Sequence, residues 1–196
     1  LEPLGVCLHT ANLIEPKFTE SATIFGAGPI GLCMYSILKK MGLKDIYMID
    51  KLPYRVKFAK EFGAKDSFLL ADDYNKKIKE LTNGMGTTIT VDTGGTSESI
   101  DGCINVAAVN GKVALVGIPE ADFVNYNPHR MRTKELTIKN VRRSNQTLDD
   151  CVKNYTDDNE IEKIISHKFD FENIQQAFDL VADYSDQVLK CIVKNN

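Results

Sequence analysis

The sequence predicts an α/β fold in which helices cover both faces of a doubly wound, six-stranded parallel sheet. Three observations carry this prediction. Short β-favouring runs alternate with stretches of helical apolar spacing, a glycine cluster follows the first such run, and 43% of the 196 residues are hydrophobic. Alternating strands and helices join through right-handed crossovers, which make the strands parallel. We also expect partial elements of a second domain at both ends of the chain.

The apolar periodicity indicates one helix, near residues 3–12, before the first strand. Strands are expected at 21–25, 45–50, 67–70, 87–92, 112–118 and 135–141. The helices between them are expected at 29–41, 53–62, 73–82 and 96–107. Beyond residue 141 the pattern gives helices at 147–155, 159–165 and 171–183, a short strand at 166–169 and a closing strand at 187–193. The chain therefore divides into a helix and linker (1–18), a layered domain (19–144) and a carboxy-terminal segment (145–196).

Charge, hydropathy and cysteine usage exclude several classes of protein. The 24 basic and 27 acidic residues give a net charge of −3 and are dispersed, so nucleic acid is not an expected partner. No apolar run is long enough for a bilayer and the first residues do not read as a signal peptide, so we expect no membrane contact and a cytoplasmic location. The five cysteines are odd in number and lack any C-x-x-C pair, which disfavours a disulfide framework or a self-contained zinc site.

A glycine cluster, IFGAGPIGL at 24–32, stands where the first strand should turn into a helix. There Gly26 permits a tight turn, Gly28 lets the backbone approach a phosphate, and Gly31 lets the helix pack closely on its strand. Pro29 suits the first helical position. The amides and dipole of the helix start favour a pyrophosphate, so these residues predict a dinucleotide site.

Asp50 ends the second strand, nineteen residues after Gly31. A carboxylate at this position accepts hydrogen bonds from the adenosine ribose and repels a 2′-phosphate, which favours NAD over NADP. Lys51 and Arg55 lie close by in the sequence and could tolerate a phosphate, so NADP is not excluded.

Two later strands also end in glycine-bearing turns. The first is VDTGG, with Asp92, Thr93 and Gly94, and the second is LVGIP, with Val116, Gly117 and Ile118. Ligands of an open parallel sheet lie beyond the carboxyl ends of its strands, so both turns are expected to flank the nicotinamide half of the cofactor. The alternative is an ordinary connection from strand to helix, where glycine is also common.

The ordered series EPLGVCLH, GAGPIGL, MIDKLPYRVKFAKEFGA, VDTGG, ALVGIP, KELTIKNVRRS and SHKFDFENIQQAFD resembles the zinc-containing medium-chain dehydrogenases, and most closely their polyol branch. The resemblance covers essentially the whole chain. It implies oxidation of a secondary alcohol or polyol with NAD, in which zinc polarises the hydroxyl and hydride passes to the nicotinamide. It also implies a homodimer formed through the cofactor domains, with strand 135–141 at the edge of the sheet.

The resemblance assigns roles to individual residues. Ile30, Asp50 and Arg55 are expected at the adenosine and pyrophosphate end, and Val116, Gly117 and Ile118 at the carboxamide. Arg143 matches an arginine placed near cofactor and substrate, although a solvated charge is the alternative. Glu2 matches a carboxylate facing the catalytic zinc, although an acid favouring a helix start is an equal alternative.

In the family an amino-terminal domain that carries the zinc ligands precedes the EP motif, and this sequence does not contain it. Since catalytic zinc needs about three protein ligands, we expect no zinc in this chain, and NAD binding without turnover of an alcohol. Two alternatives remain open at this point. One is a stand-alone NAD-binding module, and the other is a methyltransferase that uses S-adenosylmethionine.

Overall fold

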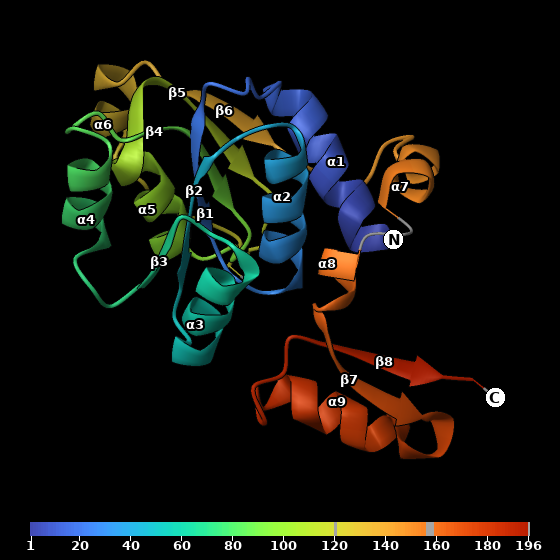
Figure 1. The fold of residues 1–196 in the computed structure, drawn as a ribbon. Coiled ribbons are helices and arrows are strands. Elements are labelled where there is room, and N and C mark those ends of the chain that lie inside the picture. The colour runs from blue at the N-terminus through green and yellow to red at the C-terminus, as the bar shows by residue number, and fades with distance from the viewer. Residues whose placement is uncertain (120, 156–158, 196) are drawn as a thin grey trace.

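A computed structural model describes residues 1–119, 121–155 and 159–195. Its main body is a six-stranded sheet in the order β3-β2-β1-β4-β5-β6, with every neighbouring pair parallel (Figure 1). The strands are β1 (Ser21–Phe25), β2 (Asp45–Asp50), β3 (Asp66–Leu69), β4 (Thr87–Asp92), β5 (Ala107–Leu115) and β6 (Thr137–Asn140). This topology confirms the predicted fold class. The strand order reverses between β1 and β4, and ligands of such sheets bind beyond the carboxyl ends of the strands at that point.

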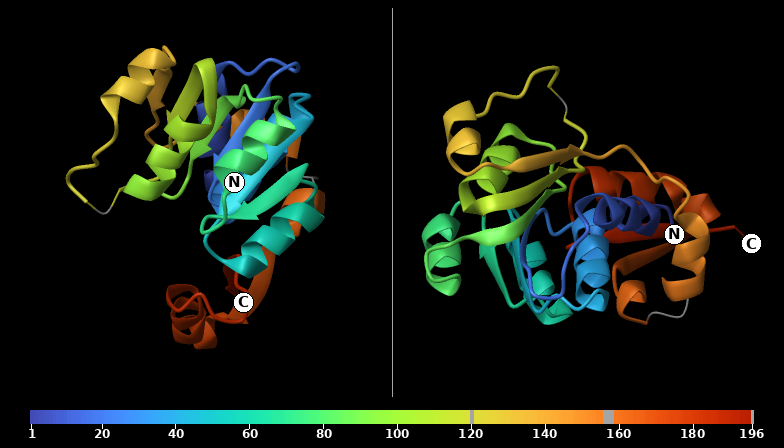
Figure 2. Two further views of the ribbon diagram at one scale, coloured as in Figure 1. Left: turned by 90° about the vertical axis from the view of Figure 1, so that its left-hand side faces the viewer. Right: turned by 90° about the horizontal axis from the view of Figure 1, so that it is seen from above.

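Helices cover both faces of the sheet, with α1, α2 and α3 on one side and α4 and α5 on the other (Figures 1 and 2). Their bounds are α1 (Glu2–Ile14), α2 (Pro29–Lys40), α3 (Pro53–Phe62), α4 (Tyr74–Leu81) and α5 (Ser97–Val106). A shorter helix, α6 (Pro128–Thr133), precedes β6. The two-sided cover explains why the central strands are apolar along almost their whole length.

The central strands send alternate side chains into two separate cores. Ile24 and Met48 pack with α1 and α2, whereas their neighbours Phe25 and Ile49 pack with α4 and α5. This alternation is the two-residue period of a strand buried on both faces. Full burial of each of these side chains contributes about 1.5–3 kcal/mol to the free energy of folding.

The carboxy-terminal segment packs first against α1 and then extends beyond the carboxyl ends of the main strands (Figure 1). It contains α7 (Leu148–Tyr155), α8 (Asn159–Glu162), β7 (Ile165–Asp170), η1 (Phe171–Asn173), α9 (Ile174–Ala182) and β8 (Lys190–Lys194). β7 and β8 form a two-stranded parallel sheet that α9 contacts. Cys151 and Tyr155 of α7 join the same apolar core as α1, so the chain's two end segments meet on one face of the main sheet. The domain boundaries stay a prediction.

Strand β5 differs from the expected 112–118 at both ends. It begins at Ala107, directly after α5, and its pairing with β4 shifts register where Asn110 adopts a left-handed backbone with φ of 59°. It ends at Leu115 because the amide of Val116 makes the last ladder bond to the carbonyl oxygen of Asp92, and the amide of Gly117 turns to that same oxygen instead of continuing the ladder.

The carboxy-terminal elements differ more from expectation. The helix expected at 159–165 ends at Glu162, because Ile165 pairs with Lys190 and begins β7. The strand expected at 187–193 begins at Lys190, since Gln187 has a left-handed backbone with φ of 54°. The helix expected at 171–183 opens as a 3-10 turn. Helix α6 was not predicted, because its short sequence carries no apolar period. Within the described residues, no helix combines the length and apolar character needed to cross a membrane.

Candidate functional site

A cavity of about 450 Å³ lies at the carboxyl ends of β1, β2 and β4. It brings together most of the residues that the sequence singled out. The predicted residues that line it are Gly26, Gly28, Pro29, Ile30, Gly31, Asp50, Arg55 and Thr93. The switch point of the sheet therefore coincides with the predicted dinucleotide site.

The glycine turn has almost no room for side chains. Gly26 has φ of +105°, and a Cβ there would lie 2.3 Å from Oγ1 of Thr93. A Cβ on Gly31 would lie only 1.8 Å from the carbonyl oxygen of Gly26. These two glycines allow β1 to turn sharply and α2 to pack against the turn.

Gly28 differs from Gly26 in its backbone, which is extended, with φ of −77° and ψ of −173°. Other residues also adopt these angles. Gly28 caps α2 without any side-chain hydrogen bond, and Pro29 follows in the first turn. The first amides of a helix have no acceptor inside it, so those of Ile30 and Gly31 are available to an anion. A Cβ on Gly28 would lie 3.2 Å from Nη1 of Arg55, on the cavity side.

Asp50 is only 7% exposed and is held by the backbone on both sides. Its Oδ2 accepts a hydrogen bond from the amide of Ala27 at 2.7 Å, and its Oδ1 accepts one from the amide of Leu52 at 2.9 Å. Nη1 of Arg55 lies 4.0 Å from Oδ2. Nε of Arg55 is buried and has no hydrogen-bond partner among the described residues. This unpartnered donor and the bare glycine turn fit a dinucleotide that supplies acceptor oxygens.

Asp92, at the end of β4, belongs to the predicted VDTGG turn and connects it to the LVGIP turn, a role that the sequence did not assign to it. Its buried carboxylate accepts hydrogen bonds from the amides of Gly94 and Gly95, both at 3.0 Å, and from Oγ of Ser99 at 2.6 Å. Its carbonyl oxygen accepts the amide of Gly117 at 3.1 Å. Burial raises the pKa of the Asp92 carboxyl, and these hydrogen bonds oppose that rise.

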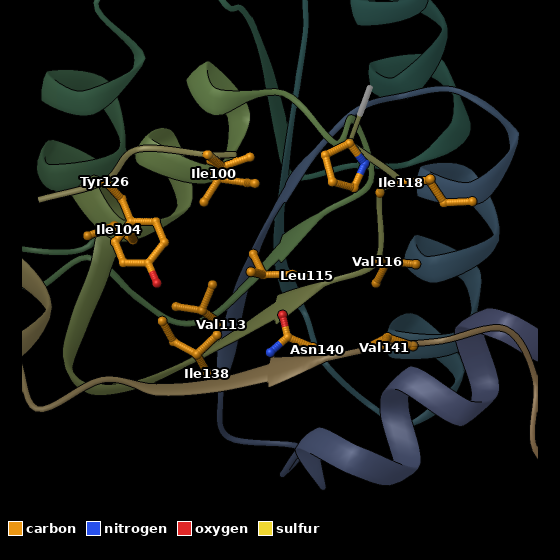
Figure 3. Close-up of a pocket in the computed structure, with 13 residues that line it drawn as sticks. Ile100, Ile104, Val113, Leu115, Val116, Ile118, Tyr126, Ile138, Asn140 and Val141 are labelled. Carbon is orange, nitrogen blue, oxygen red and sulfur yellow. The ribbon is translucent and has the colours of Figure 1, made fainter. Parts of the chain in front are cut away.

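Val116, Gly117 and Ile118 line a second cavity, of about 380 Å³, rather than the first. Figure 3 shows the apolar side chains of α5, β5 and β6 gathered around it, with Tyr126 and Asn140 beside them. A Cβ on Gly117 would lie 2.1 Å from the amide nitrogen of Gly95, so this turn packs directly on the VDTGG turn.

Arg143 and Glu2 lie outside both cavities. Arg143 is exposed, with φ of 55°, and Glu2 is exposed in the first turn of α1. Nowhere in 1–119, 121–155 or 159–195 do three His, Cys, Asp or Glu side chains gather as a metal site would require. The described residues therefore do not fit a catalytic zinc.

The carboxy-terminal segment contributes side chains that sequence reasoning missed. Tyr184, Lys190 and Cys191 line the first cavity opposite the glycine turn. They lie more than 130 residues away from that turn in the sequence, and no local pattern marks them. Only the placement of α9 and β8 over the carboxyl edge of the sheet reveals them.

Comparison with known sequences identifies the family. The sequence model described as "Zinc-binding dehydrogenase" matches residues 29–160, which is more than half of the chain. The chain belongs to this family. Membership in the zinc-binding dehydrogenases confirms the resemblance seen in the sequence and removes the methyltransferase alternative.

Individual relatives within this family are distant but match along nearly the whole chain. Sorbitol dehydrogenase 1 of Saccharomyces cerevisiae is 26% identical over 202 residues, covering 98% of this chain and 56% of the yeast protein. L-threonine 3-dehydrogenase of Bacillus subtilis is 29% identical, covering 92% and 53%. The crystal structure of 2R,3R-butanediol dehydrogenase from Bacillus subtilis superposes with a TM-score of 0.86 at 26% identity, covering 100% and 56%. The chain thus spans about half the length of the curated relatives that it matches.

Proposed function

We propose that this chain binds NAD(H) and supplies the cofactor half of an oxidoreductase that acts on a secondary alcohol or polyol. The observation that carries the proposal is the meeting of the glycine turn, Asp50 and Arg55 in one cavity at the switch point of the sheet. Family membership and the similarity to a sorbitol dehydrogenase support the alcohol or polyol as the substrate class.

Each end of the cofactor has a proposed set of contacts. The free amides of the first turn of α2 bind the pyrophosphate, and Gly28 leaves room for it. Asp50 accepts hydrogen bonds from the ribose hydroxyls, and Nε of Arg55 donates to an oxygen of the nucleotide. Val116, Gly117 and Ile118 meet the carboxamide from the neighbouring turn, where the hydrogen bonds of Asp92 hold the backbone in place.

Bound NAD would supply the acceptor for the hydride of an alcohol carbon. The residues of this chain bind and orient the nicotinamide for that transfer. We propose that Arg143 lies near cofactor and substrate in the complete enzyme, and that Glu2 faces its zinc directly or through water. The other zinc ligands would come from outside this sequence, so the chain alone binds NAD without oxidising an alcohol.

We also propose a homodimer formed through the cofactor domains, in the cytoplasm. β6 ends the sheet, so its outer edge offers unpaired amides and carbonyls to another chain. Beside it, the side chain of Ile118, which lines the apolar cavity of Figure 3, is 89% exposed, and that of Phe123, the residue before Val124 of the same cavity, is 87% exposed. A second copy related by a two-fold axis would cover both features in a self-complementary contact.

Calorimetric titration of the chain with NAD tests the proposed function. We expect saturable binding that a Gly28→Val substitution abolishes, while a Glu80→Gln substitution at an exposed position of α4, outside the cavity, leaves it intact. No binding at millimolar NAD by a folded chain would refute the proposal. Assays with sorbitol and NAD should show no NADH formation by the chain alone.

A further inference from the structure

Tyr184, in the turn between α9 and β8, lies against two cations at the adenosine end of the cavity. Its ring centroid is 5.5 Å from Nζ of Lys51 and 5.2 Å from Cζ of Arg55. The same ring lines the cavity with Asp50. In Figure 1 this turn lies below α3, which carries Arg55. A cation over an aromatic face is attracted by the ring quadrupole.

Arg55 is held from several sides at once. Its Nη1 faces Oδ2 of Asp50 at 4.0 Å, and its Cζ lies 5.8 Å from the ring centroid of Tyr54 as well as against Tyr184. The Arg55 side chain is only 14% exposed. The carboxylate and two aromatic rings therefore fix the direction of its positive charge.

The turn that carries Tyr184 is itself anchored. Oδ2 of Asp186 lies 3.2 Å from Nε2 of His167 on β7, and the hydroxyl of Tyr54 donates to the carbonyl oxygen of Val188 at 2.9 Å. Tyr184 has φ of 50°, in the left-handed region that bulky residues seldom adopt. These contacts keep the ring beside the cations.

We propose that Tyr184 determines the choice between NAD(H) and NADP(H). A nearby arginine is the usual means of accommodating the 2′-phosphate of NADP, and Lys51 and Arg55 are the cations beside Asp50 that could serve it. Tyr184 engages both, so the repulsion between Asp50 and a 2′-phosphate is left uncompensated. This inference rests on the proposed binding of NAD.

A Tyr184→Leu substitution tests the proposal, because it keeps apolar bulk at the turn and removes the aromatic face. Calorimetric titrations with NAD and NADP should show the affinity for NADP rising about fivefold relative to that for NAD. Tyr184→Phe, which keeps the ring, should retain the wild-type ratio. Phe178→Leu is the matched control, because Phe178 is an exposed residue of α9 outside the cavity, and it should also retain the wild-type ratio.

A double-mutant cycle with Lys51 separates a specific role from a structural one. Lys51→Met alone should leave NADP affinity unchanged within about twofold, since the ring already engages that cation. In the Tyr184→Leu chain, Lys51→Met should remove the part of the gain in NADP affinity that Lys51 supplies. The Lys51→Met variant can be measured even if the Tyr184→Leu chain does not fold. A loss of NADP affinity of more than about twofold in Lys51→Met alone would overturn the proposal.

The outcomes distinguish this inference from the function on which it rests. If Tyr184→Leu keeps the wild-type ratio, or weakens both dinucleotides equally, the proposal is wrong while NAD binding by the wild type still stands. If the folded wild type binds neither dinucleotide, both proposals fail together.

Discussion

Oδ2 of Asp50 accepts a hydrogen bond from the amide of Ala27 at 2.7 Å, which joins the end of β2 to the middle of the glycine turn. The carboxylate proposed to select the ribose therefore also fixes the loop proposed to bind the pyrophosphate. One residue therefore couples the proposed ribose contact to the proposed pyrophosphate loop.

Replacing Asp50 with asparagine should reduce the preference for NAD over NADP by about tenfold, or about 1.4 kcal/mol. The neutral amide keeps an oxygen for the amide of Ala27 but no longer repels a 2′-phosphate. Calorimetric titration of both dinucleotides measures the ratio. Glu80→Gln, an exposed acid on α4, is the control and should leave it unchanged. Equal affinities in the wild type would remove the role assigned to Asp50.

Substitutions at Gly28 and Gly31 should differ in their effects on NAD binding and on the free energy of unfolding. Gly28→Val should abolish NAD binding and change the free energy of unfolding by no more than about 1 kcal/mol, because its backbone suits any residue and its Cβ meets only the flexible end of Arg55. Gly31→Ala should cost about 1–3 kcal/mol or more, because its Cβ would meet the carbonyl oxygen of Gly26 at 1.8 Å. Urea denaturation and NAD titration of both variants check this. A stable Gly31→Ala chain would show that the turn can relax.

Asp92→Asn should destabilise the fold by about 1–3 kcal/mol. The carboxylate accepts from two glycine amides and from Ser99, and an amide group would direct its own N–H groups towards these donors. Urea denaturation gives the change. Asp122→Asn, at an exposed position, serves as the control and should fall within about 0.5 kcal/mol of wild type. An unchanged midpoint for Asp92→Asn would contradict the assigned role.

Cys191 should be the thiol that labels first in the native chain. Burial raises the pKa of Cys33 to about 12 and that of Cys7 and Cys103 as well, so these thiols carry almost no reactive thiolate near pH 8. Cys191 is only partly buried, in the first cavity. Its pKa is also raised by partial burial, so labelling should accelerate as the pH rises towards 10.

Saturating NAD should slow the labelling of Cys191, because the dinucleotide would occupy the cavity that this side chain lines. A disulfide reagent followed by peptide mass mapping identifies the labelled residue, and the unfolded chain, in which all five cysteines react, calibrates the signal. Labelling of Cys191 at the same rate with and without NAD would place the nucleotide elsewhere.

The chain should be a dimer at micromolar concentration, and Phe123→Asp should make it a monomer. The phenylalanine is 87% exposed and precedes Val124, which lines the apolar cavity that includes residues of β6, and a charge there would be costly to bury in a contact between copies. Light scattering measures the mass. Phe178→Asp, an exposed aromatic on α9 away from that edge, should stay dimeric. A monomeric wild type would refute the proposed assembly.

The sequence by itself determined the layered fold and the core of the site. The turn at Gly26, Gly28 and Gly31 and the acid at Asp50 are local patterns, since the strand, the turn and the start of the helix occupy one continuous stretch. Alternating apolar runs predicted the six strands, and right-handed crossovers between them predicted that the strands are parallel. These features depend on residues close together in the sequence, where period and turn chemistry act directly.

Only the tertiary structure decided which distant residues complete the site. Tyr184 and Cys191 line the cavity because β8 pairs with β7 and carries the turn after α9 over the carboxyl edge of the sheet. Asp92 connects two turns because β4 and β5 end side by side. Long-range contacts of this kind are set by how elements pack, which periodicity does not encode, and so Tyr184 and Cys191 carry no local signal in the sequence.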